Sequence, residues 1–190
     1  MIGQWTHQWL ESQSYLSRYF ETTTSTNLIA KENASNEPGP LTFYVADRQT
    51  MGRGQGNHKW LNTDPGTNLL LTYSIDCHRP PQPELCVSIG EQLKETCSLV
   101  WPELQWQLKP PNDLLLYQKK VAGILLESIS QGPHHRLLLG LGFNALDFPK
   151  SHDFLATSLQ SHLPQPLEQV QWNQFLSELF RRVTETCLLG

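Results

Sequence analysis

Residues 47–60 combine three glycines with basic side chains, a composition typical of loops that bind anions. The glycines stand at 52, 54 and 56, and Arg53 lies between the first two. An apolar run at residues 41–46 leads into the stretch and predicts a strand. Glycine lets a backbone approach a ligand closely, so a strand ending in this stretch indicates a site for a small anionic ligand. The alternative is an ordinary surface loop.

Three further stretches hold residue types that often form sites. Residues 109–113 (Lys-Pro-Pro-Asn-Asp) place a cation, an amide and a carboxylate at a proline bend. Residues 120–125 (Lys-Val-Ala-Gly-Ile-Leu) begin a strand with a lysine, and residues 140–144 (Gly-Leu-Gly-Phe-Asn) place two glycines in an apolar strand. Paired strand glycines often mark the close approach of a ligand or another backbone. Taken singly, each stretch has a simpler alternative: a bend, a surface lysine or a bulge.

Length and charge narrow the class of protein. The chain has 190 residues, which is enough for one domain with a sizeable core. Its 14 basic and 18 acidic residues give a net charge of −4. Broad binding to nucleic acid needs a basic face, so we expect no DNA partner. A local basic loop in an acidic protein suits a small anionic ligand.

The sequence carries no evident targeting or metal-binding pattern. Residues 1–10 lack the long apolar core of a signal peptide, and no apolar run approaches the roughly 20 residues that span a membrane. The four cysteines show no C-x-x-C spacing and are interpreted as reduced thiols. The seven histidines show no spacing typical of a metal site. We therefore predict a cytoplasmic protein without a membrane partner or a histidine metal centre.

Hydrophobic periodicity predicts a mixed α+β fold. Amphipathic helices are predicted over residues 84–100 and 172–187. Strands are predicted at residues 18–22, 41–48, 68–75, 104–108, 114–117, 121–128 and 136–144. Several of these strands follow one another through turns rather than helical crossovers. The pattern favours a largely antiparallel sheet over a doubly wound one.

Shorter elements join these strands and helices. Either Ser25 or Thr26 is predicted to cap a helix that starts there, because a hydroxyl oxygen can accept from the amides of a first turn. Four other elements are predicted: a short helix or irregular segment over 1–17, a turn at 118–120, a hairpin turn at 131–133 and a short helix over 154–163.

Together and in this order, the motifs resemble those of the catalytic domain of biotin–protein ligases. The family's signatures are Ser-Thr-Asn, Gln-x-x-Gly-Arg-Gly-Arg-x-x-Arg-x-Trp, Lys-Trp-Pro-Asn-Asp, Lys-x-x-Gly-Ile-Leu-x-Glu and Gly-x-Gly-x-Asn. Their counterparts here are residues 25–27, 49–60, 109–113, 120–127 and 140–144. The resemblance covers roughly residues 19–144. It implies the fold shared with class II aminoacyl-tRNA synthetases, with residues 1–190 as one catalytic domain.

The resemblance implies a two-step reaction, that of a biotin–[acetyl-CoA-carboxylase] ligase. ATP and biotin form biotinyl-5′-AMP, and a lysine of a biotin carboxyl carrier protein then takes the biotinyl group. Mg²⁺ is expected to accompany ATP, and relatives suggest a homodimer that pairs sheet edges. Two alternatives stay open: a lipoate–protein ligase or octanoyltransferase, and a non-catalytic module that binds biotin or its adenylate. The motifs at 52–54 and 109–113 favour biotin, and the intact Lys120 and Asp113 favour an enzyme.

The resemblance also assigns roles to individual residues. The implied catalytic residues are Lys120, Arg53 and Asp113, with Asp113 also a candidate Mg²⁺ contact. The implied biotin-binding residues are Ser25, Thr26, Asn27, Gln49, Gly52, Arg53, Gly54, Gln55, Lys120 and Gly123. The implied ATP- or adenylate-binding residues are Arg53, Gln55, His58, Trp60, Lys109, Asn112, Lys120 and Asn144.

The sequence departs from the family pattern at three motif positions. Gln55 and His58 stand where arginines are usual, and Pro110 replaces a tryptophan. We hypothesise that the missing arginine at 55 weakens the grip on biotinyl-AMP. The resemblance also leaves no room before residue 19 for a helix-turn-helix domain and none after the last helix for a C-terminal β-barrel. We therefore expect a short form without a repressor role.

Overall fold

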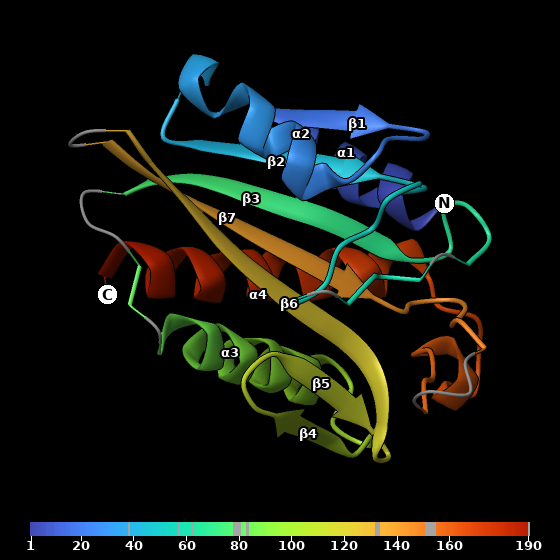
Figure 1. The fold of residues 1–190 in the computed structure, drawn as a ribbon. Coiled ribbons are helices and arrows are strands. Elements are labelled where there is room, and N and C mark those ends of the chain that lie inside the picture. Colours follow the sequence, from blue (N-terminus) through green and yellow to red (C-terminus); the bar gives the residue numbers. More distant parts are fainter. Residues whose placement is uncertain are drawn as a thin grey trace.

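The apolar runs of the sequence pair into one seven-stranded sheet in the described part of the chain (Figure 1). The computed structural model describes residues 1–37, 39–56, 58–61, 63–77, 81–82, 84–131, 134–150 and 155–189. Its helices are α1 (Ile2–Ser12), α2 (Thr26–Asn33), α3 (Leu85–Val100) and α4 (Gln169–Leu189), with 3₁₀ turns η1 (Ala34–Asn36) and η2 (Gln160–His162). Its strands are β1 (Ser17–Phe20), β2 (Leu41–Ala46), β3 (Leu69–Cys77), β4 (Trp106–Lys109), β5 (Asp113–Leu116), β6 (Lys119–Gln131) and β7 (His134–Phe143).

The sheet order is β1-β2-β3-β7-β6-β5-β4. The β1–β2 pair is parallel, and the other neighbouring pairs are antiparallel. A parallel pair needs a crossover connection, and α2 supplies it between β1 and β2. The α+β class with a largely antiparallel sheet is therefore confirmed.

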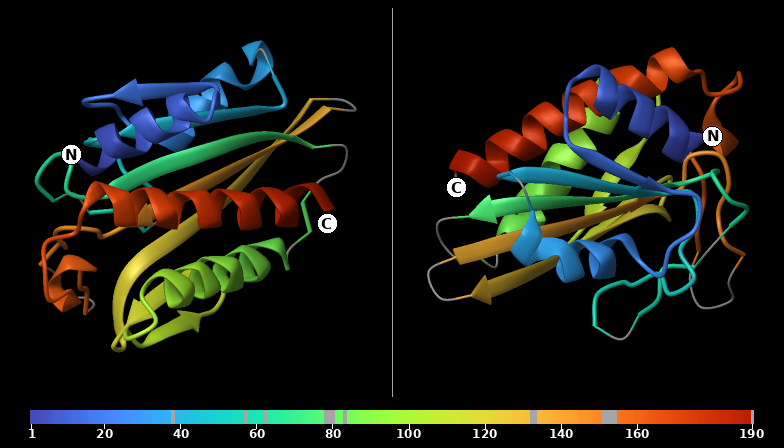
Figure 2. Two further views of the ribbon diagram at one scale, coloured as in Figure 1. Left: turned by 180° about the vertical axis from the view of Figure 1, so that it is seen from behind. Right: turned by 90° about the horizontal axis from the view of Figure 1, so that it is seen from above.

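The helices lie on both faces of the sheet. Figure 2 shows α1, α3 and α4 over one face and α2 beneath the other. The larger core fills the three-helix side, where the Phe180 ring lies 4.9 Å from Phe43 and 4.8 Å from Tyr73 between ring centroids. On the α2 side, Ala30 packs with Tyr44 and Leu138 in a smaller cluster. The α2 face therefore has room for a pocket beside its helix.

The structure settles the N-terminal segment as a helix. Residues 2–12 form α1, and Trp9 and Leu10 of this helix are buried in the larger core. The indole Nε1 of Trp172 on α4 donates to Thr6 Oγ1 at 3.0 Å, which joins the two helices through a buried hydrogen bond.

Two predicted short elements have different bounds in the structure. The turn predicted at 118–120 occupies Tyr117 and Gln118, both at positive φ, and β6 already begins at Lys119. Two such residues match the twist of a two-residue hairpin. The helix predicted over 154–163 is reduced to η2, because residues 155–157 run extended beside Lys120 and hydrogen bond to its backbone. Residue 154 and residues 132–133 of the predicted hairpin turn lie outside the described residues.

Candidate functional site

A pocket on the α2 face brings together many of the residues implied by the motifs. It encloses about 430 Å³, including open space at its mouth. Its apolar lining comes from Leu70, Leu71, Ile124, Leu125 and Leu141. The residues implied by the resemblance that line it are Ser25, Thr26, Asn27, Gln49, Arg53, Gly54, Trp60, Asn112 and Gly123.

The parallel β1–β2 pair positions the first and second motifs. Beyond the strands the pairing continues as a bridge between Thr23 and Gln49. The Thr23 amide donates to the Arg48 carbonyl at 3.0 Å, and the Thr50 amide donates to the Thr23 carbonyl at 2.8 Å. The segment before α2 and the segment after β2 are therefore held side by side, although they are far apart in sequence.

The start of α2 is capped by a side chain from the second motif. Ser25 occupies the N-cap position as predicted, but its side chain makes no capping hydrogen bond within the described part of the chain. Instead, Gln49 Oε1 accepts from the Thr26 amide at 2.7 Å and from Thr26 Oγ1 at 3.1 Å. An amide oxygen from outside the helix thus satisfies an orphan donor of its first turn. The expectation that a hydroxyl of Ser25 or Thr26 caps α2 is wrong.

A chain of hydrogen bonds crosses the sheet face beside the pocket. Thr72 Oγ1 lies 2.8 Å from Thr26 Oγ1 and donates to Asn27 Oδ1 at 2.5 Å. Asn27 Nδ2 then donates to Glu127 Oε2 at 3.0 Å. Asn27 is 3% exposed, so these partners satisfy an amide that would be costly to bury alone.

Two cations of the site are paired with carboxylates. Arg53 Nη1 lies 2.9 Å from Glu127 Oε1, and Lys120 Nζ lies 2.6 Å from Asp113 Oδ1. The Lys120 and Asp113 side chains are 28% and 20% exposed, so both can be reached from solvent. The acidic residues of the site therefore hold both of these cationic side chains in place.

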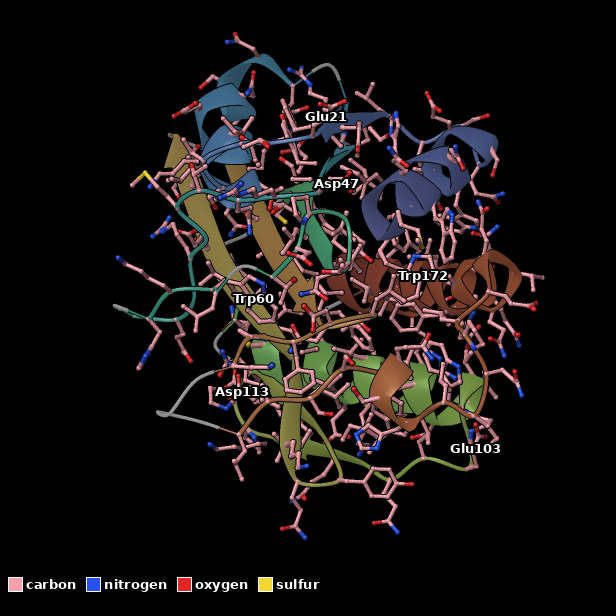
Figure 3. All side chains as sticks on the ribbon, turned by 90° about the vertical axis from the view of Figure 1, so that its right-hand side faces the viewer. Glu21, Asp47, Trp60, Glu103, Asp113 and Trp172 are labelled. Carbon is pink, nitrogen blue, oxygen red and sulfur yellow. The ribbon has the colours of Figure 1, made fainter. Side chains whose placement is uncertain are left out.

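Trp60 covers the glycines of the sheet. A Cβ placed on Gly142 would lie 2.6 Å from the Trp60 ring, and one on Gly123 would lie 3.2 Å from it. Lys120 Nζ lies 6.0 Å from the centroid of the same ring. Figure 3 shows Trp60 on the loop side of the sheet and Trp172 among the helices of the other side. The sheet glycines thus admit an aromatic side chain of the loop, whereas the approach predicted from the paired strand glycines was that of a ligand or another backbone.

Gly140 serves a second close approach. A Cβ at this position would lie 2.4 Å from Asn27 Oδ1, so any larger residue would displace the amide from its partners. This glycine allows α2 to pack on β7 with Asn27 pointing at the sheet.

Lys120 is fixed through its backbone as well as its charge. Its amide donates to the Leu155 carbonyl and its carbonyl accepts from the Thr157 amide, both at 2.9 Å. Asn144 holds the same segment, because its Nδ2 donates to the Thr157 carbonyl at 3.1 Å. Lys120, Trp60 and Asn144 line a second hollow next to the pocket.

Asn112 ties the proline bend to β6. Its Nδ2 donates to the Ile124 carbonyl at 3.0 Å, and its own carbonyl accepts from the Ile124 amide at 2.9 Å. The bend is thereby held against the strand that carries Gly123 and Lys120. Asp113 follows directly and reaches Lys120.

Four other implied residues do not line the main pocket in this structure. Gln55 lines a separate hollow with residues 124–128 of β6. His58 and Lys109 are exposed and line none of the described pockets. Gly52 is buried beneath Trp60, where an added Cβ would lie 2.7 Å from the Trp60 carbonyl oxygen. Their ligand roles stay predictions.

Two residues of the site were given no role from the sequence. Glu127 pairs with Arg53 and Asn27, and its place at the end of the fourth motif was a signal that could have found it. Thr72 lies within an apolar strand, where a buried hydroxyl needs a partner. That partner comes from α2, far away in sequence.

A partly buried hydrogen bond anchors the base of the loop. Tyr19 of β1 donates from its hydroxyl to Asp47 Oδ2 at 2.5 Å. Burial, and then this acceptor with its negative charge, raise the pKa of Tyr19 to about 12. The phenol therefore stays protonated and donating throughout the physiological pH range.

The described residues contain no group of three or more His, Cys, Asp or Glu side chains placed to hold a metal ion. They also contain no helix that is long and apolar enough to cross a membrane.

Sequence comparison finds one family and several curated relatives. The model of the Biotin/lipoate A/B protein ligase family matches residues 19–144. The bifunctional ligase/repressor BirA of Bacillus subtilis (strain 168) is 30% identical over 161 residues, covering 80% of this chain and 48% of that protein. The biotin–[acetyl-CoA-carboxylase] ligase of Paracoccus denitrificans is 31% identical over 137 residues, covering 67% and 53%. The chain thus spans about half the length of these relatives.

Structural comparison finds the same fold. The biotin protein ligase of Leishmania major in complex with biotinyl-5-AMP is similar with a TM-score of 0.71 at 24% identity, over 90% of this chain and 75% of that one. The biotin protein ligase of Aquifex aeolicus in complex with biotin and ATP gives a TM-score of 0.69 at 23% identity, over 90% and 72%.

Proposed function

We propose that this chain, which belongs to the Biotin/lipoate A/B protein ligase family, is a biotin–protein ligase. It would activate biotin with ATP to biotinyl-5′-AMP and pass the biotinyl group to a lysine of a carrier domain. Two curated relatives bear ligase names, and two solved relatives are complexes with biotin and ATP or with biotinyl-5-AMP.

The observation that carries the proposal is a pocket with apolar walls beside two cations. Leu70, Ile124 and Leu141 suit a hydrocarbon chain and ring, while Gln49 and Ser25 supply hydrogen-bonding groups at the α2 end. Arg53 lines the same pocket, and Lys120 lies beyond Trp60 in the adjoining hollow. A ligand with a neutral polar head, an apolar body and an anionic tail fits this order of environments.

The chemistry needs charge neutralisation and alignment. A carboxylate and a polyphosphate repel each other, so the attack on the α-phosphorus requires cations beside both. Lys120, whose backbone is held by residues 155–157, would stabilise charge on the phosphate and carboxylate oxygens. Arg53 would lie along the biotinyl-phosphate after leaving Glu127. Asp113 would contact the incoming lysine as a general base.

Several finer features belong to the same proposal. Mg²⁺ would enter with ATP, since it commonly binds through one or two carboxylates and substrate phosphates, and Asp113 offers such a carboxylate. The carrier would be a biotin carboxyl carrier protein, with the acetyl-CoA-carboxylase carrier as first choice. A homodimer, the absence of DNA binding and a cytoplasmic location are parts of the proposal that rest on resemblance and composition.

The test is an incubation of the protein with ATP, Mg²⁺ and labelled biotin, with and without a carrier domain. We expect labelled carrier, and bound biotinyl-AMP when the carrier is omitted. A carrier with its target lysine replaced by arginine is the matched control. Binding of biotin without adenylate or labelled carrier would contradict the proposal and favour a non-catalytic module.

A lipoate-linked reaction is the second candidate, because the matching family includes lipoate ligases by its name. Parallel reactions with labelled lipoate and octanoate, each offered a lipoyl domain, separate the two. Labelling of the lipoyl domain in place of the biotin carrier would replace the biotin proposal with this one.

A further inference from the structure

Glu127 connects two segments of the site that are otherwise separate. Its Oε1 lies 2.9 Å and its Oε2 3.1 Å from Arg53 Nη1, so the carboxylate faces the guanidinium with both oxygens. Oε2 also accepts from Asn27 Nδ2 at 3.0 Å. One carboxylate on β6 therefore holds the glycine-rich loop through Arg53 and the start of α2 through Asn27.

The Arg53–Glu127 pair is only partly shielded from water. The side chain of Arg53 is 38% exposed and that of Glu127 is 18% exposed. Such a pair is weaker than a buried one and can exchange its partner for another anion at modest cost. The contact of Asn27 differs, since its amide is buried and bonded to Thr72 at the other end.

The pairing also affects how Arg53 can act. Arg53 lines the main pocket, yet its charge is already matched by Glu127. An anionic ligand in the pocket must therefore compete with this carboxylate for the guanidinium. An uncharged ligand of the same shape would not.

We propose that Glu127 is a positioning residue that holds the loop through Arg53 in the ligand-free protein and releases Arg53 to an anionic ligand. It also keeps Asn27 oriented throughout, because Thr72 fixes the other end of that amide. The carboxylate thereby determines how stably the loop is held against the sheet. It also determines how much Arg53 adds to the affinity for an anionic ligand. The statement about ligands rests on the proposed function, whereas the statement about the loop does not.

The loop is tested by hydrogen–deuterium exchange in the ligand-free protein. The reporters are the Gly54 amide, which donates to the His58 carbonyl, and the Trp60 amide, which donates to the Gly52 carbonyl. In Glu127→Gln the new amide oxygen can still accept from Asn27, but the ion pair is lost. We expect both reporters to exchange about two- to fivefold faster, the range for a partly exposed ion pair.

A double-mutant cycle assigns the effect to the pair. Arg53→Gln should give the same acceleration, and Arg53→Gln with Glu127→Gln should add nothing further. The matched control is Glu95→Gln, which removes the pair with Arg182 between α3 and α4 and should leave both reporters unchanged. Additive effects of the two substitutions, or unchanged exchange in Glu127→Gln, would overturn the proposal even if the protein ligates biotin.

Ligand affinity is the second measurement. It should increase in the same variant in which the loop is held less firmly. In Glu127→Gln we expect biotinyl-5′-adenylate to bind about two- to fivefold tighter, because the competing carboxylate is gone. The affinity for biotin methyl ester, which is uncharged, should not increase. Weaker binding of both ligands would show that Glu127 only supports the structure and would overturn the proposal. If neither ligand binds the unaltered protein, the proposed function fails while the exchange result still decides the role of Glu127 in the loop.

Discussion

At the scale of single residues, the site is organised around charges with assigned partners. Arg53 forms an ion pair with Glu127, and Lys120 forms an ion pair with Asp113. The carboxylate beside each cation offsets part of the cost of taking that charge out of water. Lys120 is accordingly the cation that we expect to contribute most to the chemistry, since its backbone is also fixed by the Leu155 and Thr157 segment.

Lys120→Met should therefore reduce ligation sharply. The variant keeps most of the side-chain volume and removes the charge, so we expect a loss of about 10²- to 10³-fold in turnover. Single-turnover formation of biotinyl-AMP measures it. Lys119→Met is the matched control, because neighbouring strand residues point to opposite faces. Equal losses in the two variants would contradict the role of Lys120.

Gln55→Arg tests the main departure from the family motif. An added charge-assisted contact to the adenylate should slow release of free biotinyl-AMP by about tenfold or a little more. Gln55→Met is the uncharged control. Because Gln55 lines a hollow over β6 in this structure, slower release would also mean that the loop moves toward the pocket on binding. Equal release rates from Gln55→Arg and the unaltered protein would sink the hypothesis.

At the scale of elements, segments that extend the sheet hold the site together. The parallel β1–β2 pair continues into the bridge between Thr23 and Gln49, and β6 begins with a bridge between Lys120 and Ala156. The first bridge holds the segment before α2 beside Gln49, and the second holds the segment of Ala156 beside Lys120. Removing a hydrogen bond that one of these bridges brings about should lower the free energy of unfolding by a measurable amount.

Gln49→Ala should destabilise the protein by about 1–2 kcal/mol. The substitution removes the oxygen that accepts from the Thr26 amide and hydroxyl, and so leaves an orphan donor at the start of α2. Urea unfolding followed by circular dichroism measures the change. Gln107→Thr, at an exposed position of β4, should change stability by no more than about 0.5 kcal/mol. Equal stabilities of Gln49→Ala and the unaltered protein would show that Gln49 is not the cap.

His162 should make the segment beside Lys120 sensitive to acid. Its ring is stacked on Tyr117 and its Nε2 lies 2.8 Å from Thr157 Oγ1. Burial, and then the charge of Lys119, lower the pKa of His162. The folded state thus prefers the neutral ring, and this stabilisation is complete above the unfolded pKa of about 6.5 and is lost as the pH falls below it.

The measurement is Tm between pH 7.5 and 5.5. We expect Tm to fall with acidification, and to fall less in His162→Gln, which cannot take up the proton. His58→Gln, at an exposed site, is the control and should follow the unaltered protein. If Tm of His162→Gln falls with pH in parallel with Tm of the unaltered protein, this role of His162 is contradicted.

At the scale of the whole molecule, the aromatic core that stabilises the fold and the candidate site lie on opposite faces of the sheet. Phe180 of α4 packs with Trp9, Phe43 and Tyr73, which come from α1, β2 and β3. These contacts join the helices to the face of the sheet opposite the pocket (Figure 2). Because apolar burial on that face stabilises the fold, the pocket on the other face can include polar residues and glycines beside its apolar walls.

Phe180→Ala should cost about 3–5 kcal/mol of unfolding free energy, because it removes a ring that is 1% exposed and leaves a cavity. Denaturant unfolding gives the value. Val170→Ala on the same helix, with Val170 68% exposed, should change it by no more than about 0.5 kcal/mol. Similar values for the two variants would contradict the central place of Phe180 in the core.

The sequence by itself determined the α+β class, the longer strands and helices, and the stretches from which the pocket is built. Apolar periodicity encodes those elements locally, and the glycines and lysines of ordered motifs mark the site. Only the tertiary structure decided that Gln49 caps α2, that Glu127 holds Arg53, and that Trp60 fills the space over Gly142. Each of these contacts joins residues at least 23 positions apart in the sequence. No local pattern reaches that far, so pairing of the sheet had to bring these residues together first.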